Sequence, residues 1–563
     1  MSLDLDAARR QDLTRSFRQA DVDALLAGTL SMSPHPAWTL PEQPTWHEDP
    51  FADRNWCFQY HMLRWLEPLR KAAAAGHDDA YAMWLRWVQS WMDANLEERS
   101  ASSWAWTDMS DGLRTQFLCF AAPLVAERSP ELLDRFEHAI RVHVAHLQDE
   151  RNIGKANHAM HQHESLFVAG RVLGEEPLWQ LALHRMSALL HEQYDEEGIN
   201  AEGALAYHYN NFLWWERTLK RVDLEGVDRP AGAERHLHAP EALAHGTRPD
   251  GTLVSIGDTD TQSPASIERP ETDWVSSNGA QGAPPAELVK VYSAGYVFGR
   301  SGWGCAQRPF AQHSFYSVRF GPSKRVHGHP DGTSVTYSAA GVNWLVDPGK
   351  YSYTSSPERL YMTSRAAHNV LSVEGRRART DVDVRLVRQN ISAEFHDVLL
   401  EDPTFVRAPI TRRVIWCADG EFLVVVDQVD AGGRAVRATQ RWLLGPEVHA
   451  DVDGATVRLD QGPQRAAICV LGADVQIGTV RGRSDPFEGW MSYRWKAIRP
   501  ATAVLASVEA VRPQLVTVIA AGSGRAPSAQ LLPSGSPHEL QVQVDTGAGV
   551  HTLRITSDQV LSA

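Results

Sequence analysis

Residues 327–375 read HGHPDGTSVTYSAAGVNWLVDPGKYSYTSSPERLYMTSRAAHNVLSVEG, and their pattern indicates the fold class of the C-terminal half. In TSVTYSAAGVNWLV, β-branched and aromatic residues alternate with small or polar ones, and glycine and proline punctuate the runs. Such alternation is typical of antiparallel strands that bury one face. The stretch therefore predicts strands joined by tight turns.

The same stretch is rich in histidine. His327 and His329 are two residues apart, so on an extended strand they would share a face, while Asp347 and His368 each end a strand-like run. Neutral imidazoles and one carboxylate suit Zn²⁺, so histidines of this stretch together with Asp347 form a plausible zinc set. Histidines also occur on sheets as hydrogen-bonded structural groups, and the spacing alone does not separate the two interpretations.

Similar runs continue to the end of the chain. They include RRVIWCADGEFLVVVDQVDA, QLVTVIAAGSG and HELQVQVDTG, with turn residues at about the 8–12-residue spacing that is typical of antiparallel sandwiches. Before residue 285, apolar residues instead recur at three and four, which predicts helices over 81–96, 112–127, 131–148 and 177–196. Helical hairpins of similar length in series suggest an α/α toroid or a helical solenoid.

Two domains are therefore expected in a chain of 563 residues. We predict a helical domain over 1–285 and an antiparallel β-sandwich over 286–563. The segment 262–286 is rich in Pro, Ser and Gly, and we expect it to be a linker.

Composition excludes several classes of protein. The net charge of −14 argues against a general nucleic-acid binder, and an anionic substrate would need a local basic cleft. The five cysteines form no CxxC pair, so neither a disulfide framework nor a thiolate zinc site is expected. We expect no membrane span and, from the polar N-terminus, a cytoplasmic protein unless a signal was removed. A homodimer is a further expectation.

Tryptophan and histidine are abundant, with 19 and 24 copies. Most tryptophans are expected in the core. Four lie in polar stretches where a flat ring could stack on a sugar: Trp46, Trp56, Trp104 and Trp106.

Three further groups of polar residues stand out. NHAMHQH (157–163) places Asn157 and His161 on one helix face, and AEGALAYHYN (201–210) carries Tyr207 before a histidine. Both patterns also fit structural helices. The third group is basic and surrounds the histidine-rich stretch, where it would suit a carboxylate or sulfate: Lys324, Arg325, Lys350, Arg359 and Arg365.

The order HGHxD, VDPGxYxY and AHN in 327–375 resembles the heparinase II/III-like domain. Upstream, 46–66, 157–174, 201–210 and 248–260 resemble the same enzymes in the same order, so the similarity covers most of the chain and weakens after about residue 445. The resemblance implies an N-terminal α/α toroid, an incomplete barrel, followed by a C-terminal antiparallel β-sandwich. It also implies a polysaccharide lyase with an acidic poly- or oligosaccharide as its partner.

Site roles follow from the matching motifs. By resemblance, Asn157, His158, Tyr207 and His327 are catalytic. His329, Asp347 and His368 bind a mainly structural Zn²⁺, and no organic cofactor is expected. Residues expected near the substrate are His161, Arg325, Tyr353, Tyr361, Arg365 and Trp104.

The implied chemistry is β-elimination at a uronate. The enzyme must neutralise the carboxylate, remove the C5 proton and protonate the leaving oxygen. We favour His158 as base and Tyr207 as acid, with Tyr207 in both roles left open. A glycosaminoglycan is the favoured substrate and alginate the second. Two other classes stay open: a glycoside hydrolase, which would need paired carboxylates, and a non-catalytic or biosynthesis-associated glycan-binding protein.

Overall fold

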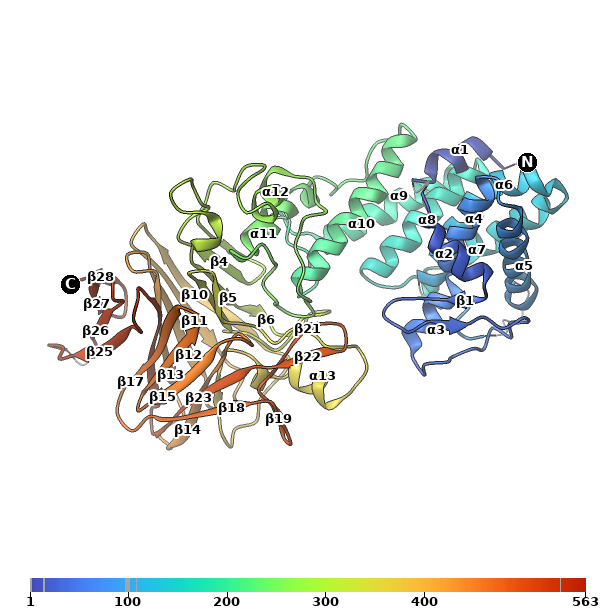
Figure 1. Ribbon diagram of the computed structural model, residues 1–563. Coiled ribbons are helices and arrows are strands. Elements are labelled where there is room, and N and C mark those ends of the chain that lie inside the picture. The colour runs from blue at the N-terminus through green and yellow to red at the C-terminus, as the bar shows by residue number, and fades with distance from the viewer. Residues whose placement is uncertain (1–2, 14–15, 97–101, 108, 537) are drawn as a thin grey trace. The chain divides into compact units, whose positions relative to one another are not determined.

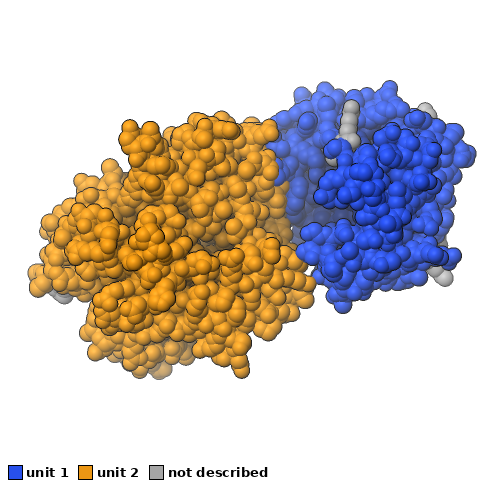
Figure 2. Space-filling model, in the orientation of Figure 1, with its two compact units in different colours: residues 1–194, 213–236 blue, residues 195–212, 237–563 orange. Residues whose placement is uncertain are grey.

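The computed structural model describes residues 3–13, 16–96, 102–107, 109–536 and 538–563. These fall into two compact units (Figures 1 and 2). Unit 1 holds residues 1–194 and 213–236, and unit 2 holds residues 195–212 and 237–563. The units therefore do not divide at residue 285, because the first half of helix α10 (Leu205–Leu224) belongs to unit 2. The change from helices to sheets does lie near that residue, between α12 (Pro270–Ser276) and β3 (Val289–Tyr292).

Unit 1 is helical, and the four helices predicted from the periodicity are confirmed. In α5 the buried residues Tyr81, Trp84, Trp87, Val88 and Trp91 recur at three and four, which explains why this sequence folds as a helix with one face in the core. The helices of unit 1 besides its part of α10 are α1 (Leu5–Gln11), α2 (Gln19–Leu26), α3 (Arg54–His61), α4 (Glu67–Ala74), α5 (Asp78–Asn95), α6 (Met109–Arg128), α7 (Leu133–Gln148), α8 (Asn157–Leu173) and α9 (Glu176–Gln193).

Helix α8 is the buried centre of unit 1 and packs against α6, α7 and α9. Its polar side chains are paired inside: Gln162 donates to Asp111 at 3.1 Å, and Glu164 accepts from Arg221. A Cβ at Gly112 would lie 3.0 Å from the Cα of Gln162, so glycine lets α6 approach α8 closely. The helix ends at Gly174, whose left-handed conformation (φ 68°) closes the last turn.

The prediction that Trp46 and Trp56 stack on a sugar is wrong. Trp46 and Trp56 are each 1% exposed and pack with Tyr60 in the core of unit 1. Trp106 is half-buried and donates from its ring nitrogen to Asn95 O at 2.9 Å. Trp104 is also half-buried. Most residues around Trp46 are exposed, whereas the rings of Trp46 and Trp56 lie in the core.

Unit 2 contains antiparallel sheets, as the alternating pattern predicted. Within the described residues, the largest sheet has nine strands in the order β15-β16-β17-β24-β13-β12-β11-β10-β6, and a five-stranded sheet has the order β3-β4-β5-β7-β8. Two four-stranded sheets have the orders β18-β23-β14-β9 and β25-β26-β27-β28. The long strands and the sheets are visible in Figure 1.

The strands of these sheets have the following bounds after β3. They are β4 (Tyr296–Arg300), β5 (Phe315–Arg319), β6 (Gly321–Pro322), β7 (Val335–Ala339), β8 (Val342–Leu345), β9 (Leu371–Val373), β10 (Asp383–Ile391), β11 (Phe395–Asp402), β12 (Ile410–Cys417), β13 (Phe422–Val429), β14 (Val436–Leu443), β15 (His449–Asp453), β16 (Thr456–Gln461), β17 (Gln464–Leu471), β18 (Gln476–Arg481), β23 (Thr502–Ala510), β24 (Gln514–Gly522), β25 (Ser528–Leu532), β26 (Leu540–Asp545), β27 (Val550–Ile555) and β28 (Val560–Ser562).

Short two-stranded pairs complete the β structure. They are β1 (Thr29–Leu30) with β2 (Trp38–Thr39) in unit 1, and β19 (Arg483–Ser484) with β20 (Phe487–Glu488) and β21 (Trp490–Arg494) with β22 (Ala497–Pro500) in unit 2.

The nine-stranded sheet is covered on both faces, which explains the continuous apolar runs in its central strands. On β12, Val414 and Trp416 belong to the large core that also contains Trp442, whereas Ile415 and Cys417 face a second core with Val542. Successive side chains point to opposite faces, so one strand serves both cores. The second core is closed by the sheet β25–β28.

The prediction that residues 262–286 form a linker is wrong. This segment contains α12 and buries Ile267 and Val275, and Val275 packs with Trp303 and Phe310. It is part of unit 2, next to α11 (Ala239–His245). Composition misled here because a few apolar side chains suffice to hold a polar segment against a core. In the described part of the chain, no helix has the length and apolar character needed to cross a bilayer.

Candidate functional site

Tyr207 and His327 lie face to face in unit 2. Their ring centroids are 3.5 Å apart and their planes differ by 7°. Tyr207 comes from the first turn of α10, and His327 from the loop between β6 and β7. The Tyr207 hydroxyl lies 2.5 Å from that of Tyr353, which is 44% exposed. Two residues predicted as catalytic are therefore adjacent, and Tyr353 extends the pair to the surface of unit 2.

The HGH loop is not a strand. His327 has a left-handed backbone (φ 59°), so it does not share a strand face with His329, and that expectation is wrong. The two imidazoles nevertheless converge, because both contact the carboxylate of Asp258. His327 Nδ1 lies 3.1 Å from Oδ2, and His329 Nε2 lies 3.0 Å from Oδ1. The carboxylate of Asp258 therefore brings the two imidazoles together, although the backbone is not an extended strand.

Glycines let three segments meet at this point. A Cβ at Gly203 would lie 2.7 Å from the Cα of Gly328, and a Cβ at Gly257 would lie 2.6 Å from His327 O. The backbones are also hydrogen-bonded: Asp258 N donates to His327 O at 2.8 Å. The start of α10, the GDTD segment and the HGH loop are thereby held in close contact.

Asp258 is ionised in this setting. Burial would raise the pKa of this carboxyl, but hydrogen bonds from His327, His329 and Arg359 outweigh burial and hold the pKa well below its usual range. The carboxylate therefore orients both histidines and has no proton to give.

Tyr207 keeps its proton at neutral pH. Burial raises the pKa of its hydroxyl, and the nearby carboxylates Glu202, Asp258 and Asp260 raise it further, against a smaller opposing effect of the hydrogen bond with Tyr353. A protonated phenol that reaches toward solvent through Tyr353 is suited to donate a proton.

A cluster of possible metal ligands lies beside this pair. Oxygen or nitrogen atoms of Asp331, Asp347 and His368 all lie within 4.8 Å of one another, and all three residues are buried. His329 Nδ1 and Asp347 Oδ1 each lie 3.2 Å from His368 Nε2. These separations are close to the ligand–ligand spacing of about 3.3 Å that follows from metal–nitrogen bonds of about 2.0 Å in a tetrahedral site.

Two buried carboxylate oxygens of this cluster support a cation. Among the described residues, Asp331 Oδ1 and Asp347 Oδ1 are buried and have no hydrogen-bond partner. Burial and the charge of Asp331 raise the pKa of Asp347 well above its usual range. A divalent ion would satisfy both oxygens, so the residues fit a metal. The sequence analysis did not include Asp331 among the candidate ligands, although this residue stands two positions after His329 in the HGHxD motif.

The other residues predicted as catalytic lie in unit 1, at the start of α8. Asn157 is 8% exposed, and the His158 ring stacks on Phe58 with centroids 6.2 Å apart. Ala156 precedes them with φ 51° and ψ −129°, a conformation that non-glycine residues rarely adopt. Backbone strain of this kind, on the order of 1–3 kcal/mol, commonly accompanies functional positions.

His161 lines a cavity of about 430 Å³ in unit 1. Arg64, Arg217, Trp65 and Trp214 also line it. Burial and the charge of Arg217 lower the pKa of Arg64, although Glu67 and Glu164 oppose this effect. Two guanidinium groups beside indole rings suit an anionic sugar. Sequence reasoning had not singled out either arginine.

Several residues expected at the substrate have other contacts. Tyr361 is 6% exposed, and its hydroxyl accepts from Gly489 N at 3.1 Å, so its surroundings are those of a core residue. Arg365 donates to Leu371 O and pairs with Asp402. Arg325 donates to Tyr296 Oη at 3.3 Å. The Arg325 side chain is half-buried and lies two residues before His327 of the HGH loop.

Two more residues of the basic group form ion pairs. Lys350 lies 3.0 Å from Asp260, and Arg359 pairs with Asp258. Their charge balances the carboxylates under the Tyr207–His327 pair. The signal for these carboxylates was the GDTD segment at 257–260, whose proximity to the HGH loop arises only on folding.

Comparison with known proteins identifies the family of this chain. The family model of the heparinase II/III N-terminus matches residues 6–275, and the heparinase II/III-like C-terminal model matches residues 287–530. The chain belongs to the heparinase II/III family. The two matches together span both the helices and most of the sheets, so the family assignment rests on the whole architecture.

Individual relatives are distant in sequence but share the fold of the family. A heparin-sulfate lyase of Bacteroides stercoris is 21% identical over 442 residues, which cover 70% of this chain and 65% of that protein. The crystal structure of heparinase III matches with a TM-score of 0.80 at 18% identity, covering 98% of this chain and 94% of that one. Heparan sulfate lyase HepC of Pedobacter heparinus matches with a TM-score of 0.74 at 16% identity, covering 99% and 92%. The chain therefore has the toroid-plus-sandwich fold of the heparinase III structures.

Proposed function

We propose that this protein is a polysaccharide lyase that cleaves a uronate-containing acidic glycan by β-elimination, with a glycosaminoglycan of the heparan sulfate type as the first substrate to test. The observation that carries the proposal is the stacked Tyr207–His327 pair, with a protonated phenol held against an imidazole that Asp258 orients. The names of the relatives support the substrate class.

Tyr207 acts as the general acid. In β-elimination the C5 proton passes to a base, the C4–O bond breaks, a C4–C5 double bond forms and the leaving oxygen takes a proton. The raised pKa of Tyr207 keeps the hydroxyl protonated until that oxygen develops charge. The same raised pKa disfavours Tyr207 as the base, and we assign that role to His158.

The substrate carboxylate must be neutralised before the C5 proton becomes acidic. Asn157 donates from its amide without acting as a base, and His327 adds a donor. Asp258 holds Nδ1 of His327 at 3.1 Å, so it fixes the ring without touching the sugar. Asp258 is therefore a positioning residue.

The cavity beside α8 supports an acidic substrate. In a chain with a net charge of −14, Arg64 and Arg217 concentrate positive charge at one cavity that two indoles also line. A bidentate guanidinium suits a carboxylate or sulfate. We assign this cavity of unit 1 to the binding of an anionic sugar.

The metal is assigned as Zn²⁺, held by His329, Asp331, Asp347 and His368. Mixed imidazole and carboxylate ligands suit zinc, and its role is to brace the HGH loop against the ends of β8 and η6 (Arg365–Ala367). The ion would take no part in the chemical step.

Asp258 is a poor candidate for the acid of a glycoside hydrolase. A hydrolase needs one carboxyl that stays protonated, whereas the pKa of Asp258 is held well below its usual range by three donors. Asp258 therefore does not supply the acid of such a pair.

The test is a substrate panel of heparan sulfate, heparin, hyaluronan, chondroitin and alginate. We expect ultraviolet absorbance from the unsaturated uronate product on heparan sulfate or another member of the panel. New reducing ends without that absorbance would mean hydrolysis. Binding without any product would favour a glycan-binding role, and either result would overturn the proposal.

A further inference from the structure

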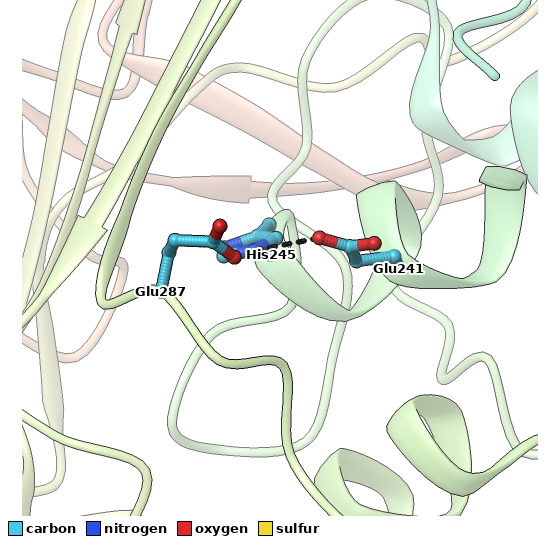
Figure 3. Close-up of side chains that lie close together, drawn as sticks. All are labelled: Glu241, His245 and Glu287. Carbon is cyan, nitrogen blue, oxygen red and sulfur yellow. Dashed lines mark ion pairs between the residues drawn. The ribbon is translucent and has the colours of Figure 1, made fainter. Parts of the chain in front are cut away.

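A second group of potential metal ligands lies in unit 2 and shares no residue with the HGH cluster. It consists of Glu241, His245 and Glu287 (Figure 3). Ligand atoms of all three side chains lie within 4.8 Å of one another, and Glu241 Oε1 is 3.8 Å from His245 Nε2. Figure 3 shows the imidazole between the two carboxylates, one on each side.

His245 is the feature that sets this group apart from an ordinary acidic surface. Its side chain is fully buried, and neither ring nitrogen has a hydrogen-bond partner among the described residues. Buried polar groups in folded proteins are normally paired, so such an imidazole indicates a missing partner. Its ring packs edge-on against Trp303 and Tyr292, with centroids 5.4 and 6.2 Å apart.

The chain holds these ligands in fixed positions. Glu241 and His245 are four residues apart on α11 and so share a helix face. The carbonyl of His245 accepts from Arg300 at 2.7 Å, and the carbonyl of Glu287 accepts from the Trp303 ring at 3.1 Å. Backbone anchors on both sides therefore set the spacing, and only the glutamate side chains need to adjust.

An ion can reach the group from solvent. The side chains of Glu241 and Glu287 are 38% and 52% exposed, while the imidazole closes the inner end. Lys290 lies 3.9 Å from Glu287 Oε1, a loose surface pair that an incoming divalent ion can displace. The observed separation of 3.8 Å is slightly wider than the ligand spacing of about 3.3 Å in tetrahedral zinc sites, so the partly exposed side chain of Glu241 would have to move closer to His245 for both to bind one ion.

We propose that Glu241, His245 and Glu287 bind a divalent transition-metal ion. One neutral imidazole and two carboxylates form a donor set that suits Zn²⁺ and leaves a position for water. The ion would join α11 to Glu287, two residues before β3, and so brace the helix against the edge of the five-stranded sheet. This site does not depend on the proposed lyase activity.

The experiment uses the full chain after removal of metal with a chelator and dialysis. Zn²⁺ is titrated by calorimetry, and Co²⁺ is followed by its visible absorption, in the wild type and in the double variant Glu241→Gln and Glu287→Gln. Both glutamates are partly exposed, so the amides are expected to leave the fold intact. The matched control is Glu268→Gln, which removes an exposed carboxylate outside the group.

We expect the wild type and the Glu268→Gln control to bind one more equivalent of Zn²⁺ than the double variant, or to bind it at least about 100-fold more tightly at this site. Asp331→Asn with Asp347→Asn should retain that equivalent, which separates the two sites. Equal stoichiometry and affinity in the wild type and the double variant would overturn the proposal. So would loss of all binding in the Asp331→Asn, Asp347→Asn variant while its melting curve stays cooperative.

Discussion

The ring of Tyr207 lies flat on the ring of His327, 3.5 Å away, although the two residues are far apart in the sequence. The hydroxyl of Tyr207 continues the contact to Tyr353 at 2.5 Å. This relationship joins the start of α10 to the HGH loop and gives the proposed lyase a proton donor and an oriented imidazole in one place.

Replacement of Tyr207 by Phe should lower kcat about 10²–10⁴-fold, the range expected for loss of a general acid. Tyr353→Phe is the matched comparison, because it removes the hydrogen-bond partner but leaves the Tyr207 hydroxyl; we expect a loss below about tenfold. Initial rates of unsaturated product and thermal melting measure both effects. A Tyr207→Phe enzyme within tenfold of the wild type would remove Tyr207 as the acid.

Asp258→Asn should destabilise the protein by about 3 kcal/mol, because the buried carboxylate pairs with Arg359 and accepts from His327 and His329. We also expect kcat to fall about 10–100-fold with little change in KM, since the orientation of His327 is lost. Asp260→Asn is the control: it removes a partly exposed partner of Lys350 and should cost about 1 kcal/mol or less. Similar effects of both variants on stability and kcat would contradict a special role for Asp258.

Chelation should lower the Tm, because removal of the ion leaves Asp331 and Asp347 with buried, unpaired oxygens. To isolate this site, the measurement uses the Glu241→Gln, Glu287→Gln background with and without chelator. In the same background, Asp347→Asn should abolish the sensitivity of the Tm to the chelator. Metal analysis showing no bound ion in either protein would exclude the HGH metal site.

Arg64→Gln should raise KM about tenfold and leave kcat within about twofold, because Arg64 lines the cavity of unit 1 and is assigned to ground-state binding of an anionic sugar. The dependence of KM on ionic strength should weaken in the variant. Arg86→Gln, an exposed arginine on α5 that does not line the cavity, is the control and should behave as the wild type. An unchanged KM in Arg64→Gln would exclude this arginine from substrate binding.

Acid should destabilise unit 1 through its buried histidines. Burial and the charge of Arg114 lower the pKa of His61 to about 3, and burial and Arg185 do the same for His163. In the unfolded chain both titrate near a pKa of about 6.5, so their stabilising effect is complete above that pH and is lost as pH falls toward 3. Each contributes a loss of up to about 1.4 kcal/mol per pH unit in that window.

The check is the fall in Tm between pH 7.5 and pH 5, which we expect to be smaller in His163→Gln than in the wild type. His138→Gln, an exposed histidine on α7, should keep the full fall. If the Tm falls equally in His163→Gln and in the wild type, the buried imidazole of His163 is not a source of acid sensitivity.

Local patterns in the sequence predicted the elements well. The three-and-four spacing of Tyr81, Trp84, Val88 and Trp91 is enough to define α5, and short runs of β-branched and aromatic residues between turn residues are enough to indicate β12 and β13. These patterns predicted the elements because the helix and strand periods depend only on residues that are neighbours along the chain. The HGHxD and AHN motifs likewise marked His329 and His368, since motifs record local chemistry.

Contacts between distant segments could be decided only by the tertiary structure. Asp258 orients both histidines of the HGH loop because Gly203 and Gly257 let three backbones approach within van der Waals limits, and no local pattern encodes that approach. Trp46 and Trp56 turned inward although their surroundings are polar, since burial of a large ring is set by the space around it. The proximity of His245 to Glu287 arose in the same way, because residues far apart in the sequence meet where α11 lies near the start of β3. The sequence by itself determined which chemical groups were available, and the packing decided which of them meet.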